Sequence, residues 1–272
     1  MPSYVVTGAN RGLGFALVTA IAADPSNTVI GLARDTNTAS ARLAADGVTR
    51  PNVTFLKADI TDVAALKKAA EETGKLTGEK LDYLINNAAL VSYVSGFKTL
   101  GDFDKEPEVL EKDLMDSFKI NVVGVVHTVN AFIPLLKKGD VKKVINISTG
   151  MADLELVNEF HVAIASPYAI SKAGLNLLTA KYNALYGPSE GILFLSISPG
   201  VVDTNESGEQ LTPEQLEGVM GMMKQFQAYA PEWKGVITPQ QSAEAVLKVT
   251  YEKSVEKDGG GFVSHHGNKR WL

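Results

Sequence analysis

The sequence contains no cysteine in its 272 residues. This absence excludes disulfides, thiolate nucleophiles, zinc–thiolate sites and cysteine-ligated iron–sulfur clusters. Four histidines occur, His127, His161, His265 and His266, and no pair has the H-x-x-x-H spacing that places two imidazoles on one helix face. We therefore expect no metal centre.

Charge of one sign and long apolar runs are also scarce. The net charge is −5 and no long run of like charge occurs, which argues against binding nucleic acid through its phosphates. No apolar run approaches the ~18 residues that span a bilayer. The first residues carry no basic stretch of the kind that opens a signal peptide. We expect a cytoplasmic protein that binds neither nucleic acid nor a membrane.

What the sequence does contain is an alternation of short β-branched runs and helical periodicity. This pattern predicts an α/β, Rossmann-type doubly wound parallel sheet of about seven strands with helices on both faces. No linker or repeat interrupts it, so we expect one domain over residues 1–272. The expected strands are 4–7, 28–33, 52–57, 81–85, 144–148, 192–198 and 261–264, and the expected helices are 12–23, 63–73, 110–137, 167–186 and 238–252.

The segment at about 205–235 departs from this rhythm. It contains Met220, Met222 and Met223 together with aromatic residues. Flexible thioethers and aromatic rings suit an adaptable lid over a bulky apolar ligand, while an amphipathic helix packed on the body is an equal alternative. Within it, Thr212-Pro-Glu-Gln is a helix start signal.

A glycine-rich loop follows the first expected strand. Gly8, Gly12 and Gly14 lie in T-G-A-N-R-G-L-G, directly before a helix. Glycine lets the backbone approach a pyrophosphate, and the helix N-terminus attracts that anion. A simple tight turn is the alternative, but the position at the start of an alternating chain favours the phosphate site.

The spacing T-G-x-x-x-G-x-G resembles the cofactor fingerprint of the short-chain dehydrogenase/reductase family. The resemblance implies a nicotinamide dinucleotide bound by the loop, including Asn10, Arg11 and Leu13. Further matches are Asp59 with Ile60, which would bind adenine, Asn86-Asn87-Ala88, in which Ala89 replaces the family's glycine, and Pro199-Gly200-Val201-Val202-Asp203-Thr204, in which Val202 and Thr204 would bind the carboxamide.

The end of the second expected strand bears on the choice between NAD and NADP. An acidic residue there binds the ribose 2′-hydroxyl of NAD, and an arginine accepts the 2′-phosphate of NADP. Ala33 stands where the family has the acid, Arg34 follows it, and Arg11 lies in the glycine-rich loop. Both arginines could be ordinary solvated side chains, and a register shift would offer Asp35 to the ribose. Because two guanidinium groups bind a phosphate strongly, we favour NADP(H).

Tyr168 and Lys172 form Y-x-x-x-K after the fifth expected strand. Residues four apart share a helix face, and a nearby ammonium lowers the pKa of a phenol. The same spacing also arises by chance as a surface pair. The resemblance implies that Tyr168 is the proton donor and that Lys172 lowers its pKa and holds the cofactor's ribose.

Two further residues complete the catalytic group that the resemblance implies. Ser148, at the end of the fifth expected strand, would stabilise the substrate's carbonyl oxygen, although a loop cap is the alternative. Asn121, on the long expected helix, would hold a water that links Lys172 to solvent. A hydrolase nucleophile is not indicated, because Asn146 stands where G-x-S-x-G has its first glycine.

Ser148 and Tyr168 are twenty positions apart, which is longer than usual in the family. We expect 151–165 to form an apolar loop beside the pocket, as in the family's carbonyl-reductase-like branch, which segment 261–272 also resembles. An edge loop that packs on itself is the alternative.

The resemblance implies reduction of a ketone or aldehyde by NADPH. The expected partners are a bulky or apolar carbonyl substrate and further copies of the chain, paired as a homodimer or homotetramer through the helices around 110–137 and 167–186. One alternative is a non-catalytic regulator that senses NADP on the same fold. The other is an alcohol dehydrogenase that works in the oxidative direction.

Overall fold

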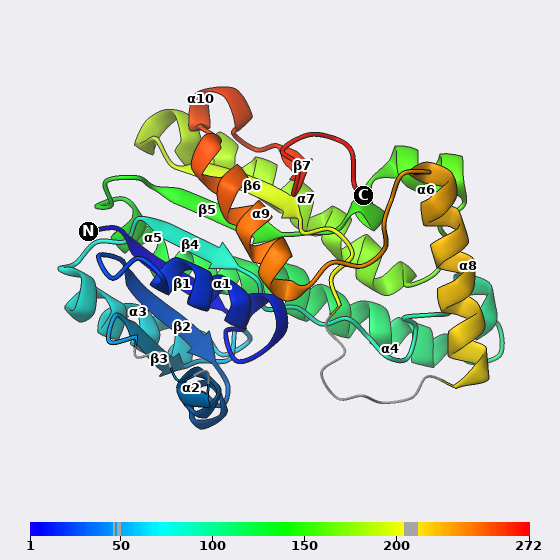
Figure 1. Ribbon diagram of the computed structural model, residues 1–272, viewed down its shortest axis with the longest axis horizontal. Coiled ribbons are helices and arrows are strands. Elements are labelled where there is room, and N and C mark those ends of the chain that lie inside the picture. The colour runs from blue at the N-terminus through cyan, green and yellow to red at the C-terminus, as the bar shows by residue number, and fades with distance from the viewer. Residues whose placement is uncertain (46, 48–49, 204–211) are drawn as a thin grey trace.

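The computed structural model contains a seven-stranded parallel sheet in the order β3-β2-β1-β4-β5-β6-β7 (Figure 1). The structure describes residues 1–45, 47, 50–203 and 212–272. The strand order reverses between β1 and β4, and ligands of doubly wound sheets bind at such a switch point. The strands are β1 (Ser3–Thr7), β2 (Thr28–Ala33), β3 (Val53–Lys57), β4 (Tyr83–Asn86), β5 (Lys143–Ile147), β6 (Leu193–Ser198) and β7 (Phe262–Ser264).

Helices cover both faces of this sheet. One face carries α1 (Gly12–Ala22), α2 (Thr36–Ala45) and α9 (Pro239–Glu252), and the other carries α3 (Val63–Thr77), α5 (Gly124–Leu136) and α7 (Ser166–Glu190). Beyond the carboxyl ends of the strands lie α4 (Pro107–Phe118), α6 (Leu154–Phe160) and α8 (Pro213–Tyr229), on the right of Figure 1. The short elements are η1 (Leu100–Phe103), η2 (Lys119–Val123), η3 (Gly150–Ala152) and α10 (Val255–Asp258).

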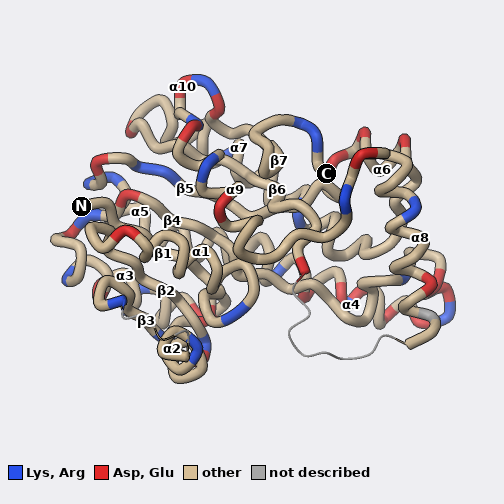
Figure 2. The backbone as a smooth tube through the Cα atoms, viewed as in Figure 1, with Lys and Arg blue, Asp and Glu red and all other residues tan. Residues whose placement is uncertain are grey.

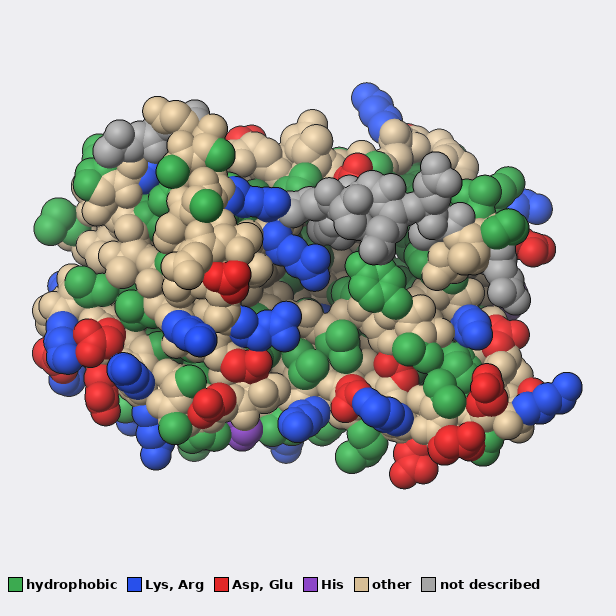
Figure 3. All heavy atoms as spheres, turned by 90° about the horizontal axis from the view of Figure 1, so that it is seen from below, with side chains coloured by type: hydrophobic (Ala, Val, Ile, Leu, Met, Phe, Trp, Pro, Cys, Tyr) green, Lys and Arg blue, Asp and Glu red, His purple; other side chains and the backbone are tan. Residues whose placement is uncertain are grey.

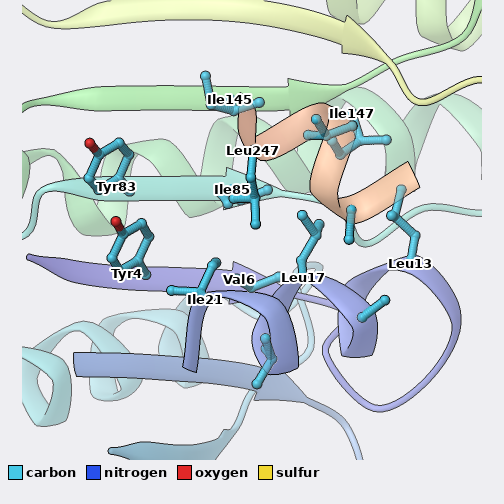
Figure 4. Close-up of a cluster of buried hydrophobic side chains, with 14 of the residues drawn as sticks. Tyr4, Val6, Leu13, Leu17, Ile21, Tyr83, Ile85, Ile145, Ile147 and Leu247 are labelled. Atoms are coloured by element: carbon cyan, nitrogen blue, oxygen red, sulfur yellow. The ribbon is translucent and has the colours of Figure 1, made fainter. Parts of the chain in front are cut away.

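The core has two layers because successive residues of a strand point to opposite faces. Val6 of β1 packs with Leu17 of α1 and Leu247 of α9, as Figure 4 shows. Its neighbour Val5 joins the second cluster, with Phe132 of α5. Charged residues of both signs are interspersed over the outer helices and loops in Figure 2.

Local sequence signals explain where several helices begin. The Asp62 side chain accepts a hydrogen bond from Ala65 N–H at the start of α3. Thr212 and Thr238 form capping boxes with the glutamines three residues later, and proline follows each threonine. These caps satisfy first-turn N–H groups that have no partner within the helix.

The parallel sheet and its seven strands confirm the prediction, and the strand bounds differ from the expected ones by two residues at most. The long expected helix was wrong in detail. It is α4, the π-helical turn η2 and α5, and Pro134 lies inside α5. Residues 151–165 are not simply a loop, because they contain α6. Helix α2 was not predicted from the sequence.

The stretch Pro107–Leu136 passes the length and composition test for a membrane-spanning helix, contrary to our expectation that no run comes near that limit. Half of its most apolar window is buried inside the fold. Residues such as Val129 and Phe132 are fully buried in the core against the sheet. A core helix of a globular protein has this character.

Candidate active site

The loops that follow β1 to β6 lie at one edge of the sheet, because all its strands run in the same direction. The glycine-rich loop, Arg34, Asp59, Asn86, Ser148 and Pro199 each follow or end one of these strands. The fold therefore brings to one edge the segments that were selected from six separate regions of the sequence.

The glycine-rich loop has a backbone geometry in which residues other than glycine would be strained. Gly8 has φ +68° and Gly12 has φ +52°. A Cβ at Gly14 would lie 2.1 Å from the carbonyl oxygen of Gly8, and one at Gly8 would lie 2.9 Å from Cα of Ala88. The loop thus passes close to both its own helix and the end of β4, which keeps the surface open for a ligand.

Helix α1 begins without a side-chain cap. Its N-cap residue is Arg11, whose side chain has no oxygen to accept hydrogen bonds from the first turn. The helices α3, α8 and α9 all have such an acceptor. A helix N-terminus of this kind, opened by glycines, suits an anionic group such as a pyrophosphate. The loop residues therefore fit a dinucleotide.

Asn87 connects this loop to β4, and no role was predicted for it. Its side-chain amide donates to the carbonyl oxygens of Thr7 and Gly8, at 3.0 and 3.3 Å. The Thr7 hydroxyl accepts from the N–H groups of Asn87 and Ala88, both at 3.0 Å. The amide of Asn86 donates to Asn146 Oδ1 of β5 at 2.8 Å. Asn86 therefore joins neighbouring strands, and only the motif's likeness to a known one could have indicated Asn87.

The adenosine side of the edge combines basic and acidic groups. Arg34 and Asp59 line an open pocket of about 480 Å³ between β3 and α3. A hydrogen bond from Thr61 N–H lowers the pKa of Asp59, and burial acts in the opposite direction. A second hydrogen bond from the Thr61 hydroxyl and the positive charges of Arg34 and Lys119 lower this pKa further. Asp59 is thus held as an anion. The side chain of Ile60 packs on Gly124, so only its backbone faces the edge.

Asp35 is occupied elsewhere. Its carboxylate accepts from the N–H groups of Asn37 and Thr38 and from the Thr38 hydroxyl, at 3.0, 3.2 and 2.6 Å. These bonds fix it at the start of α2. The register shift that would offer Asp35 to a ribose is therefore disfavoured.

Tyr168 and Lys172 lie one turn apart on α7, over the end of β5. Lys172 is 2% exposed, and its ammonium donates to the carbonyl oxygen of Ile147 at 2.6 Å and lies 5.8 Å from the centre of the Tyr168 ring. Burial lowers the pKa of Lys172 to about 7. Burial also raises the pKa of the Tyr168 phenol to about 12, although a hydrogen bond with the Thr149 side chain acts in the opposite direction.

The side chains of Ser148 and Thr149, at the end of β5, have different surroundings. The Ser148 side chain is 1% exposed, and its hydroxyl donates to Asn176 Oδ1 of α7 at 2.8 Å. The hydroxyl beside the Tyr168 phenol belongs to the next residue, Thr149. Because neighbouring side chains on an extended chain point in different directions, one position separates a buried hydroxyl from one in the site. The catalytic role expected of Ser148 therefore stays a prediction, and Thr149 is a second candidate for it.

Asn121 is fully buried within the π-helical turn η2. Its side chain accepts from Leu90 N–H at 2.8 Å and donates to Leu90 O and to the Ser171 hydroxyl, at 3.0 and 2.9 Å. Asn121 thus joins the segment after β4 to the residue that precedes Lys172. The expected link through a water would have to use other atoms than these.

The segment after β6 is held from its outer side. Pro199 O accepts from the buried Ser242 hydroxyl at 2.7 Å, and Gly200 has φ +82°. Ile237 bonds to Val201 and Asp203 on either side of Val202, so the backbone groups of Val202 point away from Ile237. Thr204, the last residue of the expected motif, lies outside the described residues.

Comparisons with known proteins agree with this geometry. The family model for the short chain dehydrogenase matches residues 3–215. The chain belongs to the short-chain dehydrogenase family. It is 48% identical to a short chain dehydrogenase, virK, of Hypocrea virens and 48% identical to a short-chain dehydrogenase/reductase, AacuF, of Aspergillus aculeatus, with full coverage of both chains in each case.

A solved structure of an NADPH-bound carbonyl reductase from chicken fatty liver is also similar to this chain. The two are 28% identical with a TM-score of 0.75, and the match covers 98% of each chain. The resemblance inferred from the motifs is thereby confirmed, and the protein is an oxidoreductase of this family.

The three other loop residues that were expected to bind the cofactor differ in how exposed they are. Leu13 is 8% exposed and belongs to the core beneath α1, so its side chain faces away from the loop's surface. Asn10 is partly exposed and Arg11 is exposed. Among the described residues, no group of three His, Asp or Glu side chains could hold a metal ion.

Proposed function

We propose that this protein reduces a ketone or aldehyde to an alcohol with NADPH, and that Tyr168 donates the proton. The observation that carries the proposal is the partly buried Tyr168 phenol, which has the Lys172 ammonium 5.8 Å from its ring centre and a hydrogen bond with the Thr149 side chain, at the edge where the glycine-rich loop lies. When bound, NADPH supplies the hydride that reduces the carbonyl carbon.

The ionisation of the site supports the reductive direction. With its pKa raised to about 12, Tyr168 carries its proton at neutral pH. An alkoxide that develops on the carbonyl oxygen is far more basic than a phenolate, so it accepts this proton. Oxidation of an alcohol would need the phenolate as a base, which the burial of Tyr168 disfavours.

Thr149 and Lys172 assist this step in different ways. The Thr149 hydroxyl donates toward the same oxygen and stabilises the charge that develops there. Lys172 lies beneath the phenol, and its charged form stabilises the phenolate left after proton transfer. Since burial lowers the pKa of Lys172 to about 7, its charge depends on pH within the neutral range.

The preference for NADP over NAD is part of the same proposal. Arg34 and Arg11 are exposed, and Asp35 is engaged at the start of α2. Figure 3 shows Lys and Arg side chains near the middle of the face seen from below, beside a hollow. The carbonyl reductase from chicken fatty liver, which is 28% identical to this chain, binds NADPH. An exposed guanidinium group at the end of β2, where Asp35 is engaged in other bonds, favours a 2′-phosphate.

Membership of an oxidoreductase family argues against the alternative of a non-catalytic sensor. Two expectations stay predictions. Self-association is supported by the exposed apolar side chains Phe118 on α4 and Leu177 on α7, and sedimentation analysis would decide it. A cytoplasmic location would be decided by fluorescence microscopy of a tagged chain.

A panel of ketones and aldehydes, followed by the absorbance of NADPH, tests the proposal. Tyr168→Phe should reduce turnover by at least about a hundredfold and leave the dissociation constant of NADPH unchanged, because it removes only the proton. Tyr186→Phe on the same helix is the matched control and should behave as wild type. Comparable turnover in Tyr168→Phe would reject Tyr168 as the acid, and an unreactive wild type would reject carbonyl reduction.

A further inference from the structure

Segment 269–272 folds back across the region beyond the strands. Trp271 is 3% exposed, and its ring stacks on Phe262 of β7 with the ring centres 4.3 Å apart. The Lys269 ammonium lies over both rings, at 5.3 Å from Phe262 and 5.4 Å from Trp271. A buried tryptophan at this place needs an explanation, because the segment belongs to no helix or strand.

Trp271 packs on the catalytic loop. A Cβ at Gly150 would lie 2.7 Å from Cβ and 2.9 Å from Cγ of Trp271, so the tryptophan side chain rests directly on the backbone of Gly150. From the other side, Gly150 N–H donates to the buried Ser198 hydroxyl at 3.0 Å. Gly150 is therefore fixed between Trp271 and β6.

Gly150 joins Thr149 to Met151, whose N–H group orients the Thr149 hydroxyl. The Thr149 hydroxyl accepts a hydrogen bond from Met151 N–H at 3.3 Å. This bond occupies a lone pair of the hydroxyl oxygen and leaves its one proton free to be donated into the site, to the Tyr168 phenol here and to the substrate's oxygen once substrate is bound. A movement of Gly150 would displace Met151 N–H and with it the orientation of Thr149.

The position of Trp271 is itself set by a helix of the lid region. The backbone N–H of Trp271 donates to the Tyr229 hydroxyl of α8 at 3.1 Å, and that hydroxyl donates to the backbone carbonyl oxygen of Lys269 at 3.3 Å. The Phe160 ring of α6 packs edge-on against Tyr229 with the centres 5.1 Å apart. The segment thus connects α6 and α8 with the loop that carries Thr149.

We propose that Trp271 is a positioning residue that holds loop 149–151, so that the Thr149 hydroxyl faces the Tyr168 phenol and the substrate's oxygen. The inference rests on the function proposed above. Trp271 packs on the backbone of Gly150 and acts through it. Its loss should therefore lower the rate of the chemical step and leave the binding of NADPH unaffected.

The kinetic test uses the carbonyl compound of the panel that wild type reduces fastest. Trp271→Ala should lower kcat about tenfold or more, change KM less than about threefold and keep the dissociation constant of NADPH. Trp271→Phe, which keeps a ring over Gly150, should restore most of kcat. Tyr251→Leu removes a ring contact of α9 remote from this loop and is the matched control. A Trp271→Phe variant as slow as Trp271→Ala would overturn the proposal.

A second measurement does not depend on turnover. In NMR spectra of the NADPH complex with methyl-labelled threonine, Trp271→Ala should shift and broaden the Thr149 methyl signal, while Thr250 in α9 keeps its signal. An unchanged Thr149 signal would overturn the positioning role. If wild type reduces no carbonyl compound, the proposed function fails, and this signal still decides whether Trp271 orients Thr149.

Discussion

Two adjacent hydroxyl side chains have different surroundings at the end of β5. Ser148 is buried and bonded to Asn176, whereas Thr149 is partly exposed and lies beside Tyr168. The motif N-I-S-T offers both, and only the direction of each side chain separates them. At the scale of single residues, function therefore depends on which hydroxyl points into the site.

Exchanging each hydroxyl separately tests this assignment. Thr149→Val keeps the shape and removes the donor, so kcat should fall by about 10²–10³ as for other donors to a developing oxyanion. Thr149→Ser should retain most of the activity. Ser148→Ala should leave kcat within about threefold and lower thermal stability, because Asn176 Oδ1 loses its donor. A larger loss of kcat in Ser148→Ala than in Thr149→Val would contradict the assignment.

The choice of cofactor is also decided by single residues. Arg34→Ala should weaken NADP binding by about ten- to a hundredfold, since a charge-assisted contact is worth roughly 1.5–3 kcal/mol. Adding Ala33→Asp should then favour NAD, because the carboxylate binds the ribose hydroxyl and repels the phosphate. Titration of both cofactors measures this, with Lys67→Ala as the control. Equal affinity of wild type for NAD and NADP would show that the arginines are bystanders.

At the scale of elements, buried polar groups join segments that the sequence does not show to be neighbours. The Asp82 carboxylate, 1% exposed at the start of β4, accepts from Ser3 N–H and Oγ at 2.9 and 3.0 Å. It also accepts from the N–H groups of Asp140 and Val141, at 2.8 and 3.1 Å. One side chain thus connects the starts of β1 and β4 with the loop before β5.

This carboxylate should make stability depend on pH. Burial acts to raise the pKa of Asp82, but the hydrogen bonds outweigh it, and the pKa lies below its ordinary value. A depressed folded-state pKa contributes stability that is present above the unfolded value near ~3.9 and is lost as pH falls through the folded value. Asp82→Asn should therefore cost about 2–3 kcal/mol at pH 7 by urea unfolding and less at acidic pH. A difference that stays constant with pH would contradict this, and Glu72→Gln is the exposed control.

The elements that the sequence predicts are those with strong local signals. Strands such as β2 are apolar on both faces, and α9 begins with a threonine–proline cap, so both follow from short-range chemistry. Helix α2 buries one residue, Ala39, and its apolar side chains are alanines apart from Leu43, so periodicity does not indicate it. The π-helical turn η2 and the place of Trp271 arise from tertiary packing and have no local signal.

At the scale of the whole molecule, the residues expected to bind the cofactor and those expected to contact the substrate belong to different parts of the fold. The sheet and its helices carry the glycine-rich loop, Arg34 and Asp59, while α4, α6 and α8 lie beyond the strand ends (Figure 1). Gln225 of α8 donates to His161 O just after α6 at 2.8 Å. Since α6 and α8 pack on each other beyond the carboxyl ends of the strands, we expect them to set the range of substrates.

Loosening the packing of α6 on α8 should thus alter selectivity without altering cofactor affinity. Phe160→Ala removes the ring that packs on Tyr229, so the wall over a bulky substrate is less ordered. KM for a bulky aryl ketone should rise about three- to tenfold, or about 1 kcal/mol, while KM for a small aldehyde and the affinity for NADPH stay as in wild type. Leu154→Ala, at an exposed site on α6, is the matched control. Equal changes in KM for bulky and small substrates would show that α6 and α8 stabilise the fold without selecting the substrate.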